Sequence, residues 1–154
     1  MATTRDHSAP DGTDREIVNT RVFDDSHERL FRAWTEPVEL TRGWGPQGFT
    51  TTFHEFDLRP GGAWRFTMHG PNGVDYPNHS VFREIVAPEC IVFDHVSGPK
   101  FRLIAILAEE EDKTRLVFRM LFETAAECAK VKGFASAANE QNFDRLEAHL
   151  AGTA

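Results

Sequence analysis

The chain has 154 residues, of which 40% are hydrophobic and 27% charged, and it contains two cysteines. This size and composition indicate one globular domain without a disulfide framework, and they exclude a multidomain machine. The 17 basic and 24 acidic residues give a net charge of -7, which disfavours nucleic acids and anionic membrane surfaces as partners.

The first fourteen residues are polar and include the turn-forming run Pro10-Asp11-Gly12. Such a segment buries too little apolar surface to offset the entropy cost of ordering. We therefore expect a disordered tail over 1–14 and a single domain over 15–152. Because the sequence shows no export signal and no apolar stretch long enough to span a bilayer, we expect a cytoplasmic protein without membrane insertion.

A strand and a pair of short helices are predicted first. The residues Ile17, Val18, Thr20, Val22 and Phe23 favour a strand over 16–23. Asp25 and Glu28 have capping-box spacing, which predicts a helix that begins behind Asp25. Pro37 ends that helix and opens a second short helix toward Gly43.

Residues 49–122 alternate apolar segments with turn signals, which predicts five or six further antiparallel strands. Because Pro77 cannot donate a hydrogen bond to a strand ladder, we expect 74–79 to be an irregular rim loop, with regular pairing beginning near Ser80.

One long helix is predicted to close the chain. Thr124 and Glu127 form a second capping box, and the helix behind it can run to about Leu150. A curved antiparallel sheet exposes one apolar face, and this helix is the element long enough to cover it. The sequence thus predicts an α+β fold, in which a sheet of six to seven strands grips the C-terminal helix.

Phe and Met side chains dominate the predicted inner face of the sheet. The chain has 13 Phe and a single Tyr. Wide aromatic rings and flexible Met suit a pocket for an apolar ligand, although an ordinary packed core gives the same pattern. The predicted ligand-binding wall comprises Trp64, Phe66, Met68, Phe93, Phe118 and Met120, with Tyr76 at the rim.

Three polar residues are candidates to orient a ligand. Asn139 and Asn142 interrupt the apolar stripe of the last helix, and a buried carboxamide needs hydrogen bonds. In the alternative interpretation the stripe rotates and both asparagines face water. His95 is predicted to orient the ligand and is the one weak candidate for catalysis, with Glu84 or Asp94 as a partner.

No nucleophile elbow, phosphate-binding loop or dinucleotide fingerprint occurs in the sequence. His54, His69 and His79 could combine with Asp57 or Asp75, but no pair has the i, i+4 spacing that makes a helical zinc site specific. We therefore predict no metal, no cofactor and no established catalytic residue.

Five strings of the sequence resemble those of a known family. They are Arg21-Val22-Phe23, Ala33-Trp34-Thr35-Glu36-Pro37, Trp44-Gly45-Pro46, the run 57–66 (DLRPGGAWRF) and the run 142–150 (NFDRLEAHL). Together they resemble the bacterial proteins similar to the C-terminal domain of the activator of the Hsp90 ATPase, the AHSA1-like family of the START-like SRPBCC superfamily. This resemblance covers nearly everything after residue 15. It implies a helix-grip (Bet v 1-like) fold, with two short helices closing one end of a deep cavity.

Members of this superfamily bind lipids, sterols, hormones or polyketides. The resemblance therefore implies a protein that binds a hydrophobic or amphiphilic small molecule (lipid, aromatic or polyketide-like) in its cavity. The sequence contains no signal for association, so a monomer and a homodimer both stay open. Two alternatives stay open: a cyclase, dehydratase or hydrolase that uses the same cavity, and a chaperone-associated or stress-related interaction module. Many relatives carry a Gly-Trp pair where this chain has Ala138-Asn139. That departure implies a larger and more polar cavity, with a ligand oxygen near Asn139 or Asn142.

Overall fold

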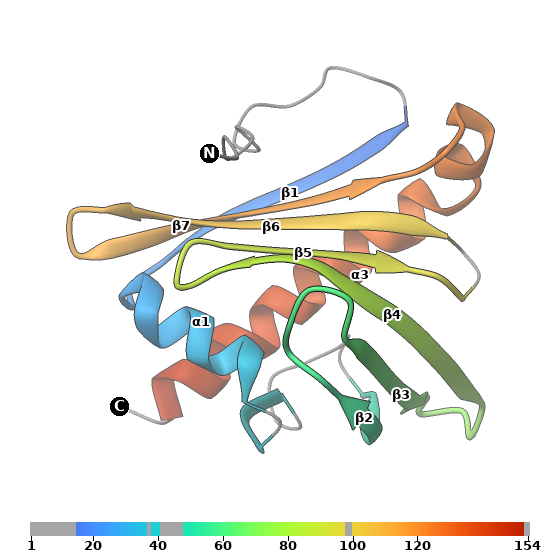
Figure 1. Cartoon of the computed structure of the whole chain (residues 1–154), viewed down its shortest axis with the longest axis horizontal. Helices are drawn as coiled ribbons and strands as arrows, with labels where there is room; N and C mark the ends of the chain where they lie inside the picture. The colour runs from blue at the N-terminus through green and yellow to red at the C-terminus, as the bar shows by residue number, and fades with distance from the viewer. Residues whose placement is uncertain (1–14, 37, 41–47, 98–99, 153–154) are drawn as a thin grey trace.

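The computed structural model describes residues 15–36, 38–40, 48–97 and 100–152. In chain order the elements are β1 (Glu16–Phe23), α1 (His27–Thr35), β2 (Thr50–Phe56), β3 (Ala63–His69), β4 (Asp75–Val86), β5 (Cys90–His95), β6 (Phe101–Glu110), β7 (Lys113–Leu121) and α3 (Ala125–Gly152) (Figure 1). The predicted tail lies outside the described residues. Of the predicted second short helix, residues 38–40 are described and are helical.

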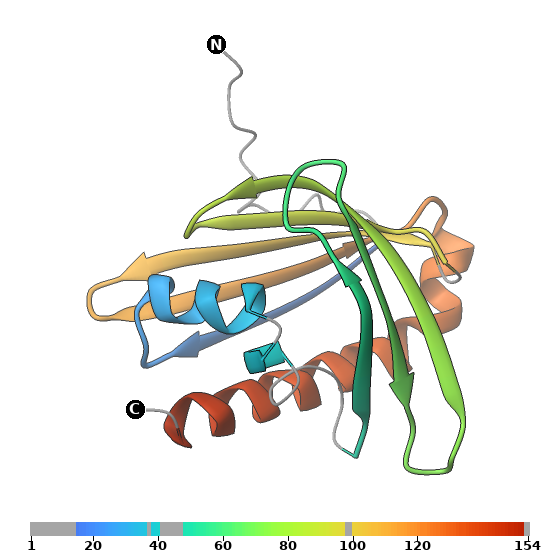
Figure 2. The same ribbon diagram turned by 60° about the horizontal axis from the view of Figure 1, so that its bottom comes forward.

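The strands form one seven-stranded antiparallel sheet in the order β1-β7-β6-β5-β4-β3-β2. Each strand from β2 to β7 pairs with the next along the chain, and β1 pairs with the last. Irregularities between Phe53 and Glu55 and between Phe82 and Glu84 bend the strands. Figure 2 shows the sheet curving over α3, with α1 on the same concave side. The predicted helix-grip fold is confirmed.

Helix α1 begins one residue later than the capping-box spacing predicts. The Ser26 hydroxyl, rather than the Asp25 carboxylate, accepts the backbone N–H of Arg29 at 3.2 Å. The backbone carbonyl of Asp25 accepts a hydrogen bond from the Thr114 hydroxyl at 2.7 Å. Asp25 therefore ties the helix entry to β7, and Ser26 supplies the cap.

Helix α3 begins where the sequence predicts. The Thr124 hydroxyl accepts the backbone N–H of Glu127 at 3.1 Å and lies 3.3 Å from the Glu127 carboxylate, to which it donates. The helix runs 28 residues to Gly152. None of the helices described by the structure combines the length and the apolar character that crossing a membrane requires.

The prediction of an irregular loop over 74–79 is wrong. Strand β4 already begins at Asp75, and Pro77 pairs with Thr67 of β3. Pairing with β5 begins only at Ser80, so this part of β4 has a neighbour strand on one side. Proline is tolerated there because a strand with one neighbour needs ladder hydrogen bonds along one edge only.

The turn between β2 and β3 is fixed by two glycines. Gly61 has φ of 85°, a conformation that residues with a Cβ rarely adopt. A Cβ on Gly62 would lie 2.0 Å from the Asp57 carbonyl oxygen. The turn is held against β4, because the Gly61 N–H donates to the Phe82 carbonyl at 2.7 Å and the Phe82 N–H donates to the Gly62 carbonyl at 2.9 Å.

The main core lies between the concave face of the sheet and the two helices. Trp34 of α1 packs edge-on against Phe118 of β7, with ring centroids 5.2 Å apart. Phe143 of α3 is fully buried and packs edge-on against Phe118 and against Phe23 of β1. These contacts fix the second half of α3 against β1 and β7.

Two polar clusters also hold α3. Near its middle, Arg21 of β1 binds Glu140 and Asp144 of α3, each at 2.8 Å. Near its end, the His149 imidazole binds Glu39 at 2.9 Å, and Glu39 also accepts from Arg29 of α1 at 2.7 Å. The helix is thus anchored to the sheet and to the short helical segment 38–40.

Candidate functional site

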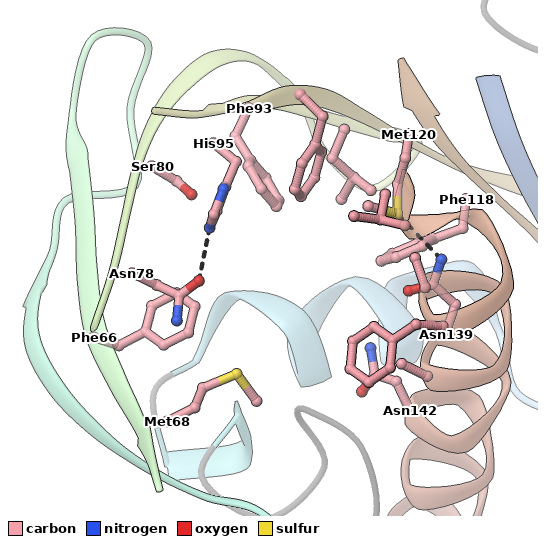
Figure 3. A pocket seen from close by; sticks show the side chains of 16 residues that line it. Phe66, Met68, Asn78, Ser80, Phe93, His95, Phe118, Met120, Asn139 and Asn142 are labelled. Carbon is pink, nitrogen blue, oxygen red and sulfur yellow. Dashed lines mark hydrogen bonds between the residues drawn. The ribbon is translucent and has the colours of Figure 1, made fainter. Parts of the chain in front are cut away.

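A cavity of about 330 Å³ lies between the concave face of the sheet and the first two thirds of α3 (Figure 3). Its wall is almost entirely apolar. Phe134 belongs to the lining although 75% of it is exposed, so the cavity opens to solvent on that side. The lining residues are Phe66, Met68, Asn78, Ser80, Phe93, His95, Phe101, Leu103, Phe118, Met120, Val131, Phe134, Ala135, Ala138, Asn139 and Asn142.

Most of the residues predicted to bind a ligand lie in this wall. They are Phe66, Met68, Phe93, His95, Phe118, Met120, Asn139 and Asn142. The alternation of strand side chains places the sheet residues there, and the helical stripe places the two asparagines. Of the two interpretations of that stripe, the structure has the one in which both carboxamides face the cavity. Ligand binding by these residues stays a prediction.

Trp64 and Tyr76 do not line the cavity. Trp64 is buried deeper in the core, where its indole stacks on Phe82 and packs edge-on against Phe93. Tyr76 is 43% exposed, and its ring lies against Phe49. Trp64 shares a sheet face with the lining residues, but at its position that face is covered by other aromatic rings.

Sequence reasoning missed Asn78, Ser80, Phe101 and Phe134. Asn78 lies in the segment predicted to be irregular and Ser80 at the predicted start of regular pairing, whereas in the structure Asn78, Ser80 and Phe82 alternate on one face of β4. That alternation was the available signal. Phe101 lies next to a predicted turn, and Phe134 lies on a part of α3 that is mostly exposed.

The polar groups on the sheet side centre on His95, which is 7% exposed. The Asn78 amide N–H donates to the Tyr76 carbonyl at 2.8 Å, so its oxygen is turned toward the imidazole. The Nε2–H of His95 therefore donates to Asn78 Oδ1 at 2.6 Å, and the imidazole stacks on Phe101. Beside them the Ser80 hydroxyl is buried without a hydrogen-bond partner among the described residues.

Neither Asp94 nor Glu84, the acidic partners predicted for His95, faces the imidazole. Asp94 points to the opposite face of β5, where it binds Arg83 at 2.8 Å and Arg102 at 2.7 Å. Hydrogen bonds from Arg102 and Arg83 outweigh burial and lower the pKa of Asp94. Glu84 pairs with Val92, whose side chain belongs to a small cluster on that opposite face. Successive strand residues alternate between faces, so Asp94 cannot join its neighbour His95.

The polar groups on the helix side are Asn139 and Asn142. The Asn139 amide nitrogen donates to Asn19 Oδ1 at 3.1 Å and contacts the Met120 sulfur at 3.3 Å. Figure 3 shows the two asparagines across the cavity from His95 and Asn78. The cavity therefore has an apolar middle and hydrogen-bonding groups on opposite walls, an arrangement that fits an amphiphilic molecule.

Two of the three histidines that were candidates for a metal site, His54 and His69, bind other side chains. His54 binds the Thr67 hydroxyl at 2.8 Å, and His69 lies between Thr52 and Asp75. Over the part of the chain that the structure describes, a single group could bring three ligating atoms together. It comprises His27, Glu28 and Glu109, none of which lines the cavity.

Comparisons with known proteins agree with this architecture. The model of the family described as "Activator of Hsp90 ATPase homolog 1-like protein" matches residues 24–151. A crystal structure of a protein from Nitrosomonas europaea is 18% identical, with a TM-score of 0.85 over 95% of this chain and 100% of that one. A solution structure of a protein from Arthrobacter aurescens is 23% identical, with a TM-score of 0.83 over 90% and 87%. A crystal structure of the AHSA1 protein from Silicibacter pomeroyi is 19% identical, with a TM-score of 0.77 over 90% and 99%. Among curated proteins, none matches the chain.

Proposed function

The chain belongs to the activator of Hsp90 ATPase homolog 1-like family, and we propose that it binds a hydrophobic or amphiphilic small molecule in the cavity between the sheet and α3. The observation that carries this proposal is an open cavity lined by Phe and Met, with hydrogen-bonding groups on two opposite walls. Mostly apolar pockets with a few polar groups are typical of small-molecule binding sites. The proposal includes the cytoplasmic location expected from the sequence.

The size of the cavity bounds the ligand. An apolar cavity of about 150 Å³ in another protein holds one benzene molecule. The cavity here, at about 330 Å³, has room for roughly two such rings. A fused two-ring aromatic compound, or an aliphatic chain of similar volume, is therefore the appropriate probe.

Filling the cavity tests the proposal. Ala138 lines the cavity, whereas the neighbouring Ala137 is exposed on α3. We expect Ala138→Phe to place a ring in the cavity and to weaken the binding of naphthalene at least about tenfold, because the ring occupies the volume that the probe needs. Ala137→Phe adds the same ring to the same helix on its solvent side and serves as the matched control. Binding is followed by changes in the ¹⁵N–¹H NMR spectrum.

Equal binding of naphthalene to both variants and to the unaltered protein would place the ligand elsewhere. Absence of naphthalene binding to the unaltered protein, with the cavity residues unperturbed in the spectrum, would remove the proposed function. Native mass spectrometry of protein purified from its own host complements this test, since a co-purifying molecule identifies the chemical class directly.

A further inference from the structure

A chain of hydrogen bonds leads from the surface of α3 to the cavity wall. At its outer end the Glu140 carboxylate, which is also bound by Arg21, accepts from the Asn19 amide at 2.8 Å. The same Asn19 amide donates to the Ser136 carbonyl at 3.2 Å. Asn19 Oδ1 in turn accepts from the Asn139 amide at 3.1 Å. The chain thus joins a charged group outside to a carboxamide in the cavity wall.

This arrangement fixes which way each carboxamide points. The partners of Asn19 Nδ2 are a carboxylate and a backbone carbonyl, and neither can donate, so this atom must be the nitrogen. Its oxygen therefore faces Asn139, whose nitrogen must face Asn19 and the Met120 sulfur. The remaining atom, Asn139 Oδ1, accepts no hydrogen bond from the described residues and points toward the cavity (Figure 3). The wall presents an acceptor at a fixed position.

The charge at the outer end strengthens this acceptor. A carboxylate draws the Asn19 N–H toward itself, which makes the Asn19 oxygen richer in electrons, and the same polarisation passes to Asn139. No lysine or arginine side chain lines the cavity within the described part of the chain. The nearest guanidinium on this path, that of Arg21, is paired with Glu140 and Asp144. An anion in the cavity would meet an electron-rich oxygen and no cation to offset its loss of hydration.

We propose that the cavity selects a neutral apolar molecule that carries an O–H or N–H group, and that this group donates to Asn139 Oδ1. This inference rests on the proposed function, because it specifies the ligand class of the same cavity. Asn19 acts as a positioning residue, since it orients Asn139 and lies behind it. Acceptor-only molecules and carboxylates of the same size gain no hydrogen bond from this oxygen.

Four two-ring probes of similar size separate these requirements: naphthalene, 2-naphthol, 2-methoxynaphthalene and 2-naphthoate. Dissociation constants are measured at pH 8, where an ordinary imidazole is neutral. We expect 2-naphthol to bind about fivefold or more tightly than naphthalene, which is the ratio given by one additional hydrogen bond. The methoxy compound should show no such gain, and 2-naphthoate should bind weaker than naphthalene.

Variants assign the effect to Asn139. In Asn139→Leu the preference for 2-naphthol over naphthalene should vanish, while naphthalene still binds. Asn19→Leu should reduce the same ratio, because Asn139 can then turn its nitrogen to the cavity. Gln141→Leu changes an exposed neighbour on α3 and should leave the ratio unaltered. The ratio is a readout that a general loss of stability does not move, since both probes use the same cavity.

The outcomes separate this inference from the proposed function. If naphthalene binds and 2-naphthol gains nothing, or if 2-naphthoate binds best, the donor requirement is overturned and the proposed function stands. If the gain persists in Asn139→Leu, the acceptor is another group and the assignment to Asn139 is overturned. If no probe binds the unaltered protein, the proposed function fails and this inference fails with it. The ranking on the unaltered protein decides the ligand class even if a variant does not fold.

Discussion

Replacing Glu39 by Gln should destabilise the protein, because Glu39 joins three parts of the fold. Its carboxylate accepts hydrogen bonds from Arg29 of α1 at 2.7 Å and from His149 of α3 at 2.9 Å. The side chain of Arg29 is 15% exposed, that of Glu39 16% and that of His149 4%. Arg32 approaches at 3.5 Å but is 54% exposed, so its contribution is small.

The magnitude follows from these contacts. Both buried donors bind the same carboxylate oxygen, Oε1, so a glutamine with its oxygen in that place keeps both hydrogen bonds but loses the charge. A hydrogen bond to a charged group contributes about 1.5–3 kcal/mol and a neutral one about 0.5–1.5 kcal/mol, so the loss is about 1–1.5 kcal/mol at each donor. We expect Glu39→Gln to lower the free energy of unfolding at pH 7 by about 2–3 kcal/mol. For a domain of this size such a loss lowers Tm by roughly 5 to 10 °C.

The same residue predicts a pH dependence. Burial, which by itself raises the pKa of Glu39, is outweighed by the hydrogen bonds from His149 and Arg29, so the folded pKa is lowered. A carboxyl group with a lowered folded pKa stabilises the protein fully above its unfolded pKa, about 4.3, and that contribution is lost as the pH falls through the folded value. The difference between the unaltered protein and Glu39→Gln should therefore shrink below about pH 4.

Urea denaturation followed by circular dichroism at pH 7 and at decreasing pH measures both effects. Glu36→Gln is the matched control, because Glu36 lies in the same connection with an exposed side chain. We expect the control to change stability by less than about 0.5 kcal/mol. A loss in Glu39→Gln no larger than that of the control, or a loss that stays constant down to pH 3.5, would refute the assigned role of the carboxylate.

Three further predictions concern thiols and glycines. Burial, with smaller contributions from nearby carboxylates, raises the pKa of Cys90 to about 12, and Cys128 is fully buried. Neither thiol should therefore react with a disulfide reagent at pH 8 until urea is added. Reaction in the folded protein would contradict this prediction. Gly62→Ala should reduce stability by more than about 3 kcal/mol or prevent folding, because its Cβ would overlap the Asp57 carbonyl; a melting temperature near that of the unaltered protein would show that the turn can shift. Gly133→Ala should raise stability by about 0.5–1 kcal/mol in a urea titration, since an added Cβ meets nothing within 4 Å in the helix; a decrease would indicate that α3 is distorted there.

Local sequence signals determined the elements of this fold. The β-branched and apolar residues over 16–23 predicted β1 with its observed bounds, and the Thr124 capping box predicted the start of α3. The turn chemistry predicted six to seven strands, of which the sheet has seven, and the resemblance to the activator family predicted how they wrap the helix. The error at Pro77 arose because a ladder hydrogen bond depends on how far the neighbouring strand extends, which no local pattern contains.

The cavity and its polarity were decided by tertiary structure. Period-two alternation assigns Trp64 and Phe66 to the same face, yet packing buries Trp64 among aromatic rings and leaves Phe66 on the cavity wall. The direction of the Asn139 carboxamide depends on Asn19, which lies 120 residues away in the sequence and across the β1–α3 interface. A sequence pattern specifies which side of an element a residue occupies. Whether that side meets a packed ring, a void or a hydrogen-bond partner depends on the curvature of the sheet and on the contacts between distant segments.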